Sequence, residues 1–177
     1  NIMALHTQKI KNTKKILNRE NYLENKIYFG IDPGYSGAIA ICKEGHWTTE
    51  YCPRDTKDIF DIISNLKNDA FIENFNLKGV IEKVWAFPTD ARTSSFKFGY
   101  NYGSWKTSLN GNRVDYYEVT PQIWMRNYNL PKEKKDRKNA LKDLAIEVVP
   151  DIKVTLKNAD AIMLCDWLIK EEHNESK

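Results

Sequence analysis

The clearest pattern of apolar and polar residues lies between residues 27 and 41, where two apolar runs flank a short turn. The first run ends in Asp32, the turn contains Pro33 and Gly34, and the second run resumes after Gly37. Apolar runs joined by a Pro-Gly turn are typical of a β-hairpin. The pattern therefore predicts two antiparallel strands with one carboxylate near their bend.

The next segments extend this pattern into a mixed sheet. Residues 47–52 form a β-rich run that Pro53 closes, which predicts a third antiparallel strand. Residues 56–71 carry apolar side chains at helical spacing, and residues 80–88 form a strand interrupted by Glu82. Because a helix between two strands makes a crossover, we expect the later strand to lie parallel to the first and beside it.

Five more elements follow along the chain. Residues 95–109 predict a helix that starts after a loop, and residues 114–119 predict the last strand. Thr120 and Pro121 then begin a short helix. Two longer helices are predicted after residue 132 and over residues 157–170, and the second of these is strongly apolar.

The helix after residue 95 has two features of its own. Four large apolar residues form a stripe along it that we expect to be mostly core: Phe98, Tyr102, Trp105 and Leu109. Gly99 and Gly103 lie one turn apart, which predicts that a neighbouring element approaches the backbone there.

Composition limits the class of protein. With 177 residues, 20.7 kDa and 41% hydrophobic residues, the chain predicts one domain with a full core. Three scattered cysteines form no disulfide framework, which indicates a reducing compartment. No apolar run approaches the roughly 20 residues of a membrane span, and no secretory signal is evident. We therefore expect a soluble, intracellular protein.

The charge is unevenly distributed although the net charge is only +3. Residues 1–26 form a basic arm, for which three explanations stay open: a solvated leader, a transit segment, or a segment that contacts nucleic acid. The predicted globular domain covers residues 27–172, and residues 173–177 form a polar tail.

Three acids stand where folding does not require them, although each has a structural explanation. Asp32 can simply begin a turn, Glu82 can face solvent from an edge strand, and Asp160 can complement a helix dipole. The predicted crossover, however, brings the carboxyl ends of two strands together, and carboxylates there form a cation site. Asp160 has small neighbours that would let its helix press against the sheet, whereas Asp166 faces the other way and is expected in solvent or in a supporting role.

Basic and aromatic side chains are candidates for DNA contact. One group follows the Glu82 strand, and a second opens the helix after residue 132, where free N–H groups also attract phosphate. For the second group, a solvated helix face is an equally open explanation. The predicted DNA-contacting residues are Arg92, Ser94, Ser95, Phe96, Lys97, Tyr102, Lys106, Lys132, Lys134, Lys135, Arg137 and Lys138.

In their order and spacing, these motifs resemble RuvC-type Holliday junction resolvases of the ribonuclease H-like superfamily, particularly the shorter phage and organellar enzymes. The resemblance extends from residue 27 to about residue 170. The matching segments are residues 30–34 with 36–38, residues 80–82, residues 95–103, residues 120–124 and residues 159–161.

The resemblance implies an α/β fold with a five-stranded mixed sheet, its first three strands antiparallel, flanked by helices. It also implies a homodimeric endonuclease that resolves four-way DNA junctions by paired symmetric nicks, with two Mg²⁺ ions per site for which Mn²⁺ substitutes. Asp32 would bridge the ions, and Glu82 and Asp160 would hold them. The compartment implied is the host-cell cytoplasm for a phage-like enzyme, or a mitochondrion or plastid if the arm is a transit segment.

The chain departs from the family at one position. Related resolvases place a further acid or a histidine one helical turn before the last Asp, and this chain has Lys157 there. A protonated lysine cannot ligate Mg²⁺, so we predict that Lys157 is catalytic by positioning water or stabilising phosphate charge. An ordinary phosphate-facing lysine is the competing explanation, and Asp151 and Asp166 are poorer substitutes by spacing.

Other functions stay open at this point. The runner-up activities are a broader branched-DNA nuclease and a nuclease for RNA in RNA/DNA hybrids, since a fold does not determine its substrate. A catalytically idle junction-binding protein is a third interpretation. A sugar-kinase or actin-like ATPase needs two lobes, for which 177 residues are too few.

Overall fold

The computed structural model describes residues 22–83, 85 and 91–175. Most of the predicted basic arm, the segment 86–90 and the last two residues lie outside these ranges. The division into arm, domain and tail therefore stays a prediction, except that the last helix continues through Glu175 into the predicted tail.

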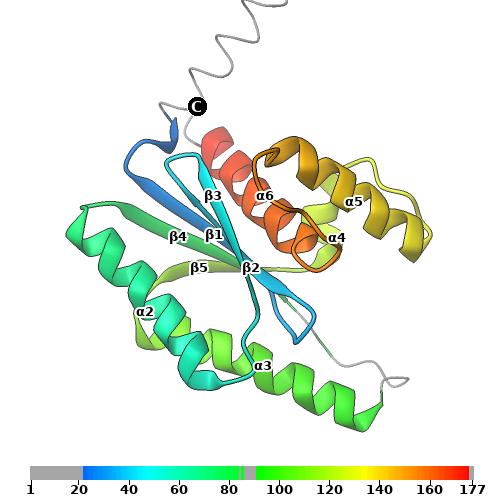
Figure 1. The fold of residues 1–177 in the computed structure, drawn as a ribbon, viewed down its shortest axis with the longest axis horizontal. Coiled ribbons are helices and arrows are strands. Elements are labelled where there is room, and N and C mark those ends of the chain that lie inside the picture. Colours follow the sequence, from blue (N-terminus) through cyan, green and yellow to red (C-terminus); the bar gives the residue numbers. More distant parts are fainter. Residues whose placement is uncertain (1–21, 84, 86–90, 176–177) are drawn as a thin grey trace, which may run out of the picture.

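A five-stranded sheet forms the centre of the molecule, with the order β3-β2-β1-β4-β5 (Figure 1). β2 pairs antiparallel with both β1 and β3, whereas β4 pairs parallel with both β1 and β5. The strands are β1 (Lys26–Asp32), β2 (Ala38–Lys43), β3 (His46–Tyr51), β4 (Asn76–Glu82) and β5 (Asp115–Val119). The predicted mixed sheet and the predicted parallel crossover are both confirmed.

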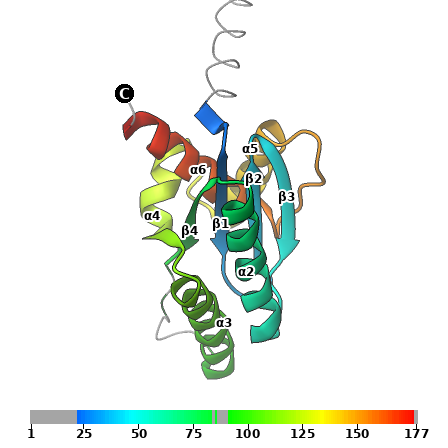
Figure 2. The same cartoon turned by 90° about the vertical axis from the view of Figure 1, so that its left-hand side faces the viewer.

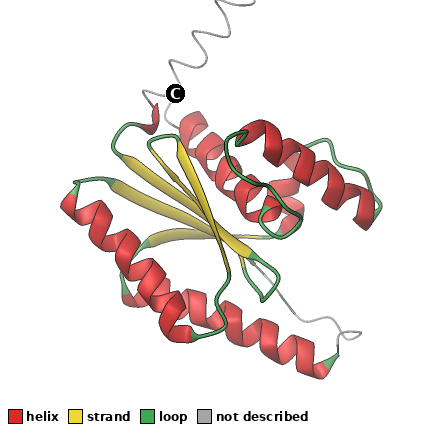
Figure 3. Cartoon of the chain, viewed as in Figure 1, coloured by secondary structure: helices red, strands yellow, loops and turns green. Residues whose placement is uncertain are grey.

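Helices cover both faces of the sheet, as the secondary-structure colouring of Figure 3 shows. Two helices lie on one face: α2 (Thr56–Ile72) and α3 (Arg92–Gly111). On the other face lie α4 (Pro121–Trp124), the 3-10 turn η1 (Met125–Asn127), α5 (Lys134–Val148) and α6 (Ala159–Glu175). No helix within the described ranges has both the length and the apolar character of a membrane span.

β1 is buried on both faces because it lies between these two helical layers. Phe29 and Ile31 belong to the core beneath α2 and α3, whereas Tyr28 belongs to the core beneath α6. Successive side chains of a strand point to opposite faces, so one strand contributes to both cores. This arrangement explains why the segment reads as a continuous apolar run.

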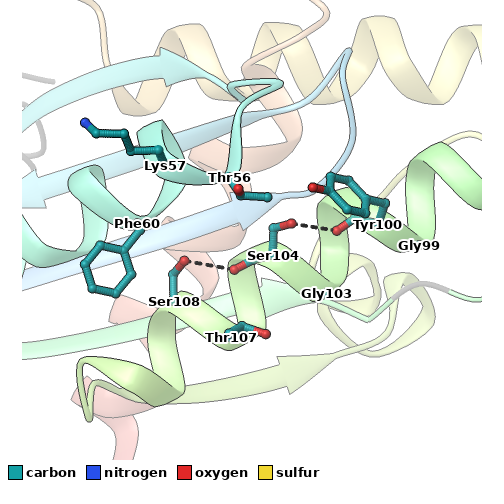
Figure 4. Close-up of a pocket in the computed structure, with 9 residues that line it drawn as sticks. All are labelled: Thr56, Lys57, Phe60, Gly99, Tyr100, Gly103, Ser104, Thr107 and Ser108. Carbon is teal, nitrogen blue, oxygen red and sulfur yellow. Dashed lines mark hydrogen bonds between the residues drawn. The ribbon is translucent and has the colours of Figure 1, made fainter.

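The close backbone approach predicted at Gly99 and Gly103 is wrong. A Cβ at either position would have no neighbour within 4 Å. Both glycines instead border an open groove of about 660 Å³ between α2 and α3 (Figure 4). The close approach occurs at Gly30, where a Cβ would lie 2.6 Å from both the Ala161 carbonyl oxygen and the Cys165 nitrogen. The absence of a side chain at Gly30 therefore lets α6 lie directly against β1.

Some element boundaries differ from the prediction. The strand predicted over residues 80–88 corresponds to β4, which runs from Asn76 to Glu82 and starts earlier than predicted because its pairing with β1 begins where Lys26 lies opposite Asn76. Residues 84 and 86–88 of the predicted strand lie outside the described residues. The helix predicted from Ser95 begins at Arg92. The observed bounds make Glu82 the last residue of β4, whereas the predicted strand continued beyond it.

Candidate active site

The three predicted carboxylates line one pocket of about 470 Å³. Asp32 ends β1 and Glu82 ends β4, and these strands are parallel neighbours, so their carboxyl ends lie together. Asp160 lies in the first turn of α6, which Gly30 admits close to the sheet. The structure thus brings together three residues that are far apart in the sequence.

Trp124 orients one of these carboxylates. Its indole Nε1–H donates a 2.9 Å hydrogen bond to Oε2 of Glu82, and the indole is fully buried. Trp124 lies in the short helix α4, which begins directly after β5. The sequence contained a signal for this helix, Thr120-Pro121, but it contained none for the side chain that Trp124 contacts.

The pocket brings three buried carboxyls within electrostatic reach of one another. Burial raises the pKa of Asp32 well above its usual range, and the neighbouring charges of Glu82 and Asp160 raise it further. Burial likewise raises the pKa of Glu82 to about 7, against the opposing effect of the Trp124 hydrogen bond. The pKa of Asp160 is raised by burial as well. Carboxylates held in this way favour binding of a cation, whether a proton or a metal ion.

This electrostatic arrangement predicts a specific pH dependence of stability for the metal-free protein. The folded-state pKa values of these carboxyls exceed their unfolded values. Between about pH 4 and pH 7, the folded protein therefore binds more protons than the unfolded chain. Their contribution to stability is present in full below the unfolded pKa values and is lost as the pH rises through the folded ones. Each proton involved contributes a slope of up to about 1.4 kcal/mol per pH unit.

Thermal unfolding in EDTA between about pH 5 and pH 8 tests this dependence. We expect Glu82→Gln to gain stability relative to the wild type as the pH increases, because the glutamine has no proton to lose. Equal melting temperatures for the two proteins across the whole range would contradict the raised pKa of Glu82.

The chemistry of the pocket suits a hard divalent cation. Carboxylate oxygens are the ligands that Mg²⁺ and Mn²⁺ prefer, and Mg²⁺ usually keeps several waters beside one or two carboxylates. In the part of the chain that the structure describes, no three His, Cys, Asp or Glu side chains are arranged closely enough to form a metal-ligand group by themselves. The carboxylates therefore border the pocket, and water molecules would have to complete the shell of a bound ion.

A basic wall faces the carboxylates across the same pocket. It consists of the side chains at the start of α5 that line the pocket, Lys134, Arg137 and Lys138. The positive charge of Lys138 opposes the rise in pKa of all three carboxyls, which places it within electrostatic reach of each. Of the predicted DNA-contacting residues on this segment, Lys132 and Lys135 are exposed but do not line the pocket.

The predicted DNA-contacting residues of α3 lie in two environments. Most of those in its first turns are exposed, and the Phe96 ring stacks on Tyr100 with 6.5 Å between ring centres. Tyr102 and Lys106 lie further along and both bind Glu118 of β5. The first turns of α3 therefore present exposed side chains, whereas Tyr102 and Lys106 are held against the sheet.

The structure does not bring Lys157 into the pocket. Its side chain is exposed, and its ammonium nitrogen lies 5.5 Å from the centre of the Tyr51 ring. A cation that does lower the pKa of Asp32 and Asp160 is Lys138, which belongs to α5. A catalytic role for Lys157 stays a prediction.

The expectation that Asp166 faces solvent is wrong. Its side chain is 1% exposed, accepts a 3.0 Å hydrogen bond from the Tyr128 hydroxyl and pairs with Lys170. These contacts hold the segment after η1 against α6. Asp166 therefore has a structural role on the face of α6 away from the pocket.

The fold has known relatives. The structure of Thermus thermophilus RuvC aligns with a TM-score of 0.55 and 12% identity, over 84% of this chain and 96% of that one. RuvC from T. thermophilus in complex with a Holliday junction substrate aligns with a TM-score of 0.52 and 11% identity, over the same shares. No protein-family model matches the sequence, and no curated protein matches it either. The chain therefore has a fold like that of RuvC, which confirms the predicted resemblance at the level of the fold.

Proposed function

We propose that this protein is a Mg²⁺-dependent endonuclease that resolves four-way DNA junctions. The observation that carries the proposal is one pocket in which three carboxylates face a basic wall. This combination suits a phosphodiester, because the acids can hold metal ions while the basic side chains bind the phosphate. The RuvC fold supports the same assignment, and one of the similar structures contains a Holliday junction substrate.

Each side chain has a distinct task in this proposal. Asp32, Glu82 and Asp160 would hold the two ions, and Trp124 keeps Glu82 turned toward the pocket. The bound ions supply charge neutralisation on both sides of an in-line displacement at phosphorus. Lys138 and Arg137 hold the phosphate from the opposite side. A water oxygen attacks phosphorus, the bond to the 3′ oxygen breaks, and the products are a 5′ phosphate and a 3′ hydroxyl.

The preference for branched DNA is assigned to the first turns of α3. This end of the helix extends beyond the ends of the strands in both views (Figures 1 and 2). It presents exposed Arg92, Phe96 and Lys97 close to the pocket, which Phe98 of the same helix lines. Cutting two symmetric strands of a junction needs two such sites, so the acting form is a homodimer.

Removing the Lys138 charge is expected to strengthen metal binding but to weaken junction cleavage. Lys138→Gln removes a positive charge that repels a metal ion, so calorimetry without DNA should show Mn²⁺ binding a few-fold more tightly. Junction cleavage at saturating metal should nevertheless fall by roughly tenfold or more, because a charge-assisted phosphate contact is lost. Lys135→Gln, on the same helix but outside the pocket, is the matched control. Unchanged metal affinity in Lys138→Gln would refute the proposed proximity.

A panel of labelled substrates tests the proposed function directly. The wild-type protein is incubated with a four-way junction, a flap, an RNA/DNA hybrid and linear duplex, each with and without Mg²⁺. Paired symmetric nicks confined to the junction are expected. Cleavage of the flap as well would indicate a broader branched-DNA nuclease, and cuts in the RNA strand would refute the resolvase. Junction binding without any product would identify an idle binding protein.

A further inference from the structure

Asn101 lies within α3, and its polar side chain is almost completely buried. The side chain is 1% exposed, and both of its functional groups make hydrogen bonds. Its Oδ1 accepts from the Gly34 N–H at 2.8 Å, and its Nδ2 donates to the Pro53 carbonyl at 3.0 Å. A buried amide is costly unless it is satisfied, so these two bonds define where the side chain must lie.

The first of these bonds fixes the turn that follows Asp32. Gly34 lies in this turn with a φ of +115°, and its carbonyl accepts from the Gly37 N–H at 3.0 Å. Phe98, on the same face of α3 as Asn101, packs so closely that a Cβ on Gly34 would lie 2.7 Å from its ring. Two side chains on successive turns of α3 therefore contact the turn, one by packing and one by a hydrogen bond.

The second bond joins this turn to the end of β3. Pro53 directly follows Cys52, whose N–H donates to the Gly37 carbonyl at 3.1 Å and whose thiol donates to the Asp32 carbonyl at 3.2 Å. Asn101 thus bridges two loops that also bind each other. Asp32 belongs to this network through its backbone carbonyl, which accepts from the Cys52 thiol.

We propose that Asn101 is a positioning residue that holds the Asp32 turn in its metal-binding conformation and links it to α3. The inference rests on the proposed function for the metal and for the DNA-contacting role of the first turns of α3. Movement of this helix on binding a junction would act on the Asp32 turn through Asn101 and Phe98. Occupancy of the DNA surface and geometry of the metal site would therefore be coupled through Asn101 and Phe98.

The test compares Asn101→Ala with Asn112→Ala. Asn112 is the matched control because its amide also makes two hydrogen bonds: its Oδ1 accepts from the Ser64 hydroxyl of α2, and its Nδ2 donates to the Ser108 carbonyl of α3. It is the C-cap residue of α3, at the far end of the helix from the pocket. Two quantities are measured on the full chain: amide hydrogen exchange of the peptide covering residues 32–37, and Mn²⁺ affinity without DNA. For Asn101→Ala we expect faster exchange in that peptide. We also expect Mn²⁺ affinity to fall by roughly tenfold or more, as is typical when a residue that orients a metal ligand is removed.

Asn112→Ala is expected to leave both quantities at the wild-type level, whatever its effect on melting temperature. Unchanged exchange of residues 32–37 in Asn101→Ala would overturn the positioning role. Equal losses of Mn²⁺ affinity in the two variants would also overturn it, because they would reflect general destabilisation. If the wild type binds no Mn²⁺, the proposed metal nuclease fails, and the exchange comparison still decides whether Asn101 holds the turn.

Discussion

Replacing Asp32 with asparagine is expected to abolish Mg²⁺-dependent cleavage of a four-way junction while leaving junction binding in Ca²⁺ or EDTA intact. Asp32 lines the same pocket as Glu82 and Asp160, and it is the carboxylate whose pKa both others raise. Metal ions contribute several kcal/mol to stabilisation of a phosphoryl transition state, and each 1.4 kcal/mol is tenfold in rate. The loss should therefore be about a thousandfold or more.

Glu82→Gln and Asp160→Asn should behave in the same way, because each removes a carboxylate from the same pocket. Asp166→Asn is the control, since it neutralises a buried acid of α6 that does not line the pocket. It should lower the melting temperature but preserve cleavage by the folded protein. Cleavage is followed with a labelled junction in excess enzyme, and full activity in any of the three pocket variants would remove that residue from the site.

Gly30→Ala is expected to cause a large loss of stability. The new Cβ would lie 2.6 Å from two backbone atoms of α6, and a backbone cannot move aside as a flexible side chain can. Overpacking of a core costs about 1–3 kcal/mol and occasionally more, so we expect about 3 kcal/mol or above. For a chain of this size, that loss lowers the melting temperature by roughly 6–12 °C.

The same substitution should also impair the site, because moving α6 away from β1 moves Asp160 away from Asp32 and Glu82. The control is Gly103→Ala, where a Cβ meets nothing within 4 Å. Alanine favours a helix over glycine by up to about 1 kcal/mol, so Gly103→Ala should be stabilising. Thermal unfolding and Mn²⁺ titration of both variants provide the measurements. If Gly30→Ala had the same melting temperature as the wild type, α6 would not be held against β1.

Much of the fold was predictable because it depends on local patterns. The hairpin around Pro33 and Gly34 was recognisable from two apolar runs and a turn. The parallel placement of β4 followed from the helix that precedes it, since a crossover leaves few other arrangements. The close backbone approach was predicted at the wrong glycines. Gly99 and Gly103 have helical spacing but face an open groove, whereas the approach occurs at Gly30, which lies in an apolar run.

The candidate site was predictable only in part. Asp32 and Glu82 could be placed together because the ends of neighbouring parallel strands coincide. Lys157 was predicted because it occupies the position at which related resolvases place an acid or a histidine, three residues before Asp160. Its ammonium lies over the Tyr51 ring, and the cations that act on Asp160 are Lys138 and Arg137. Sequence distance cannot determine which side chains of a separate helix face a pocket.

The sequence by itself determined the elements of this protein, their order and the two strand ends that carry acids, because hydrophobic periodicity and turn chemistry act over a few residues. Only the tertiary structure decided which partners complete the site. The Trp124 bond to Glu82, the Lys138 charge beside the pocket and the Asn101 bond to Gly34 all join distant segments. Such contacts depend on how α3, α4 and α5 pack on the sheet, and packing is a property of the whole chain.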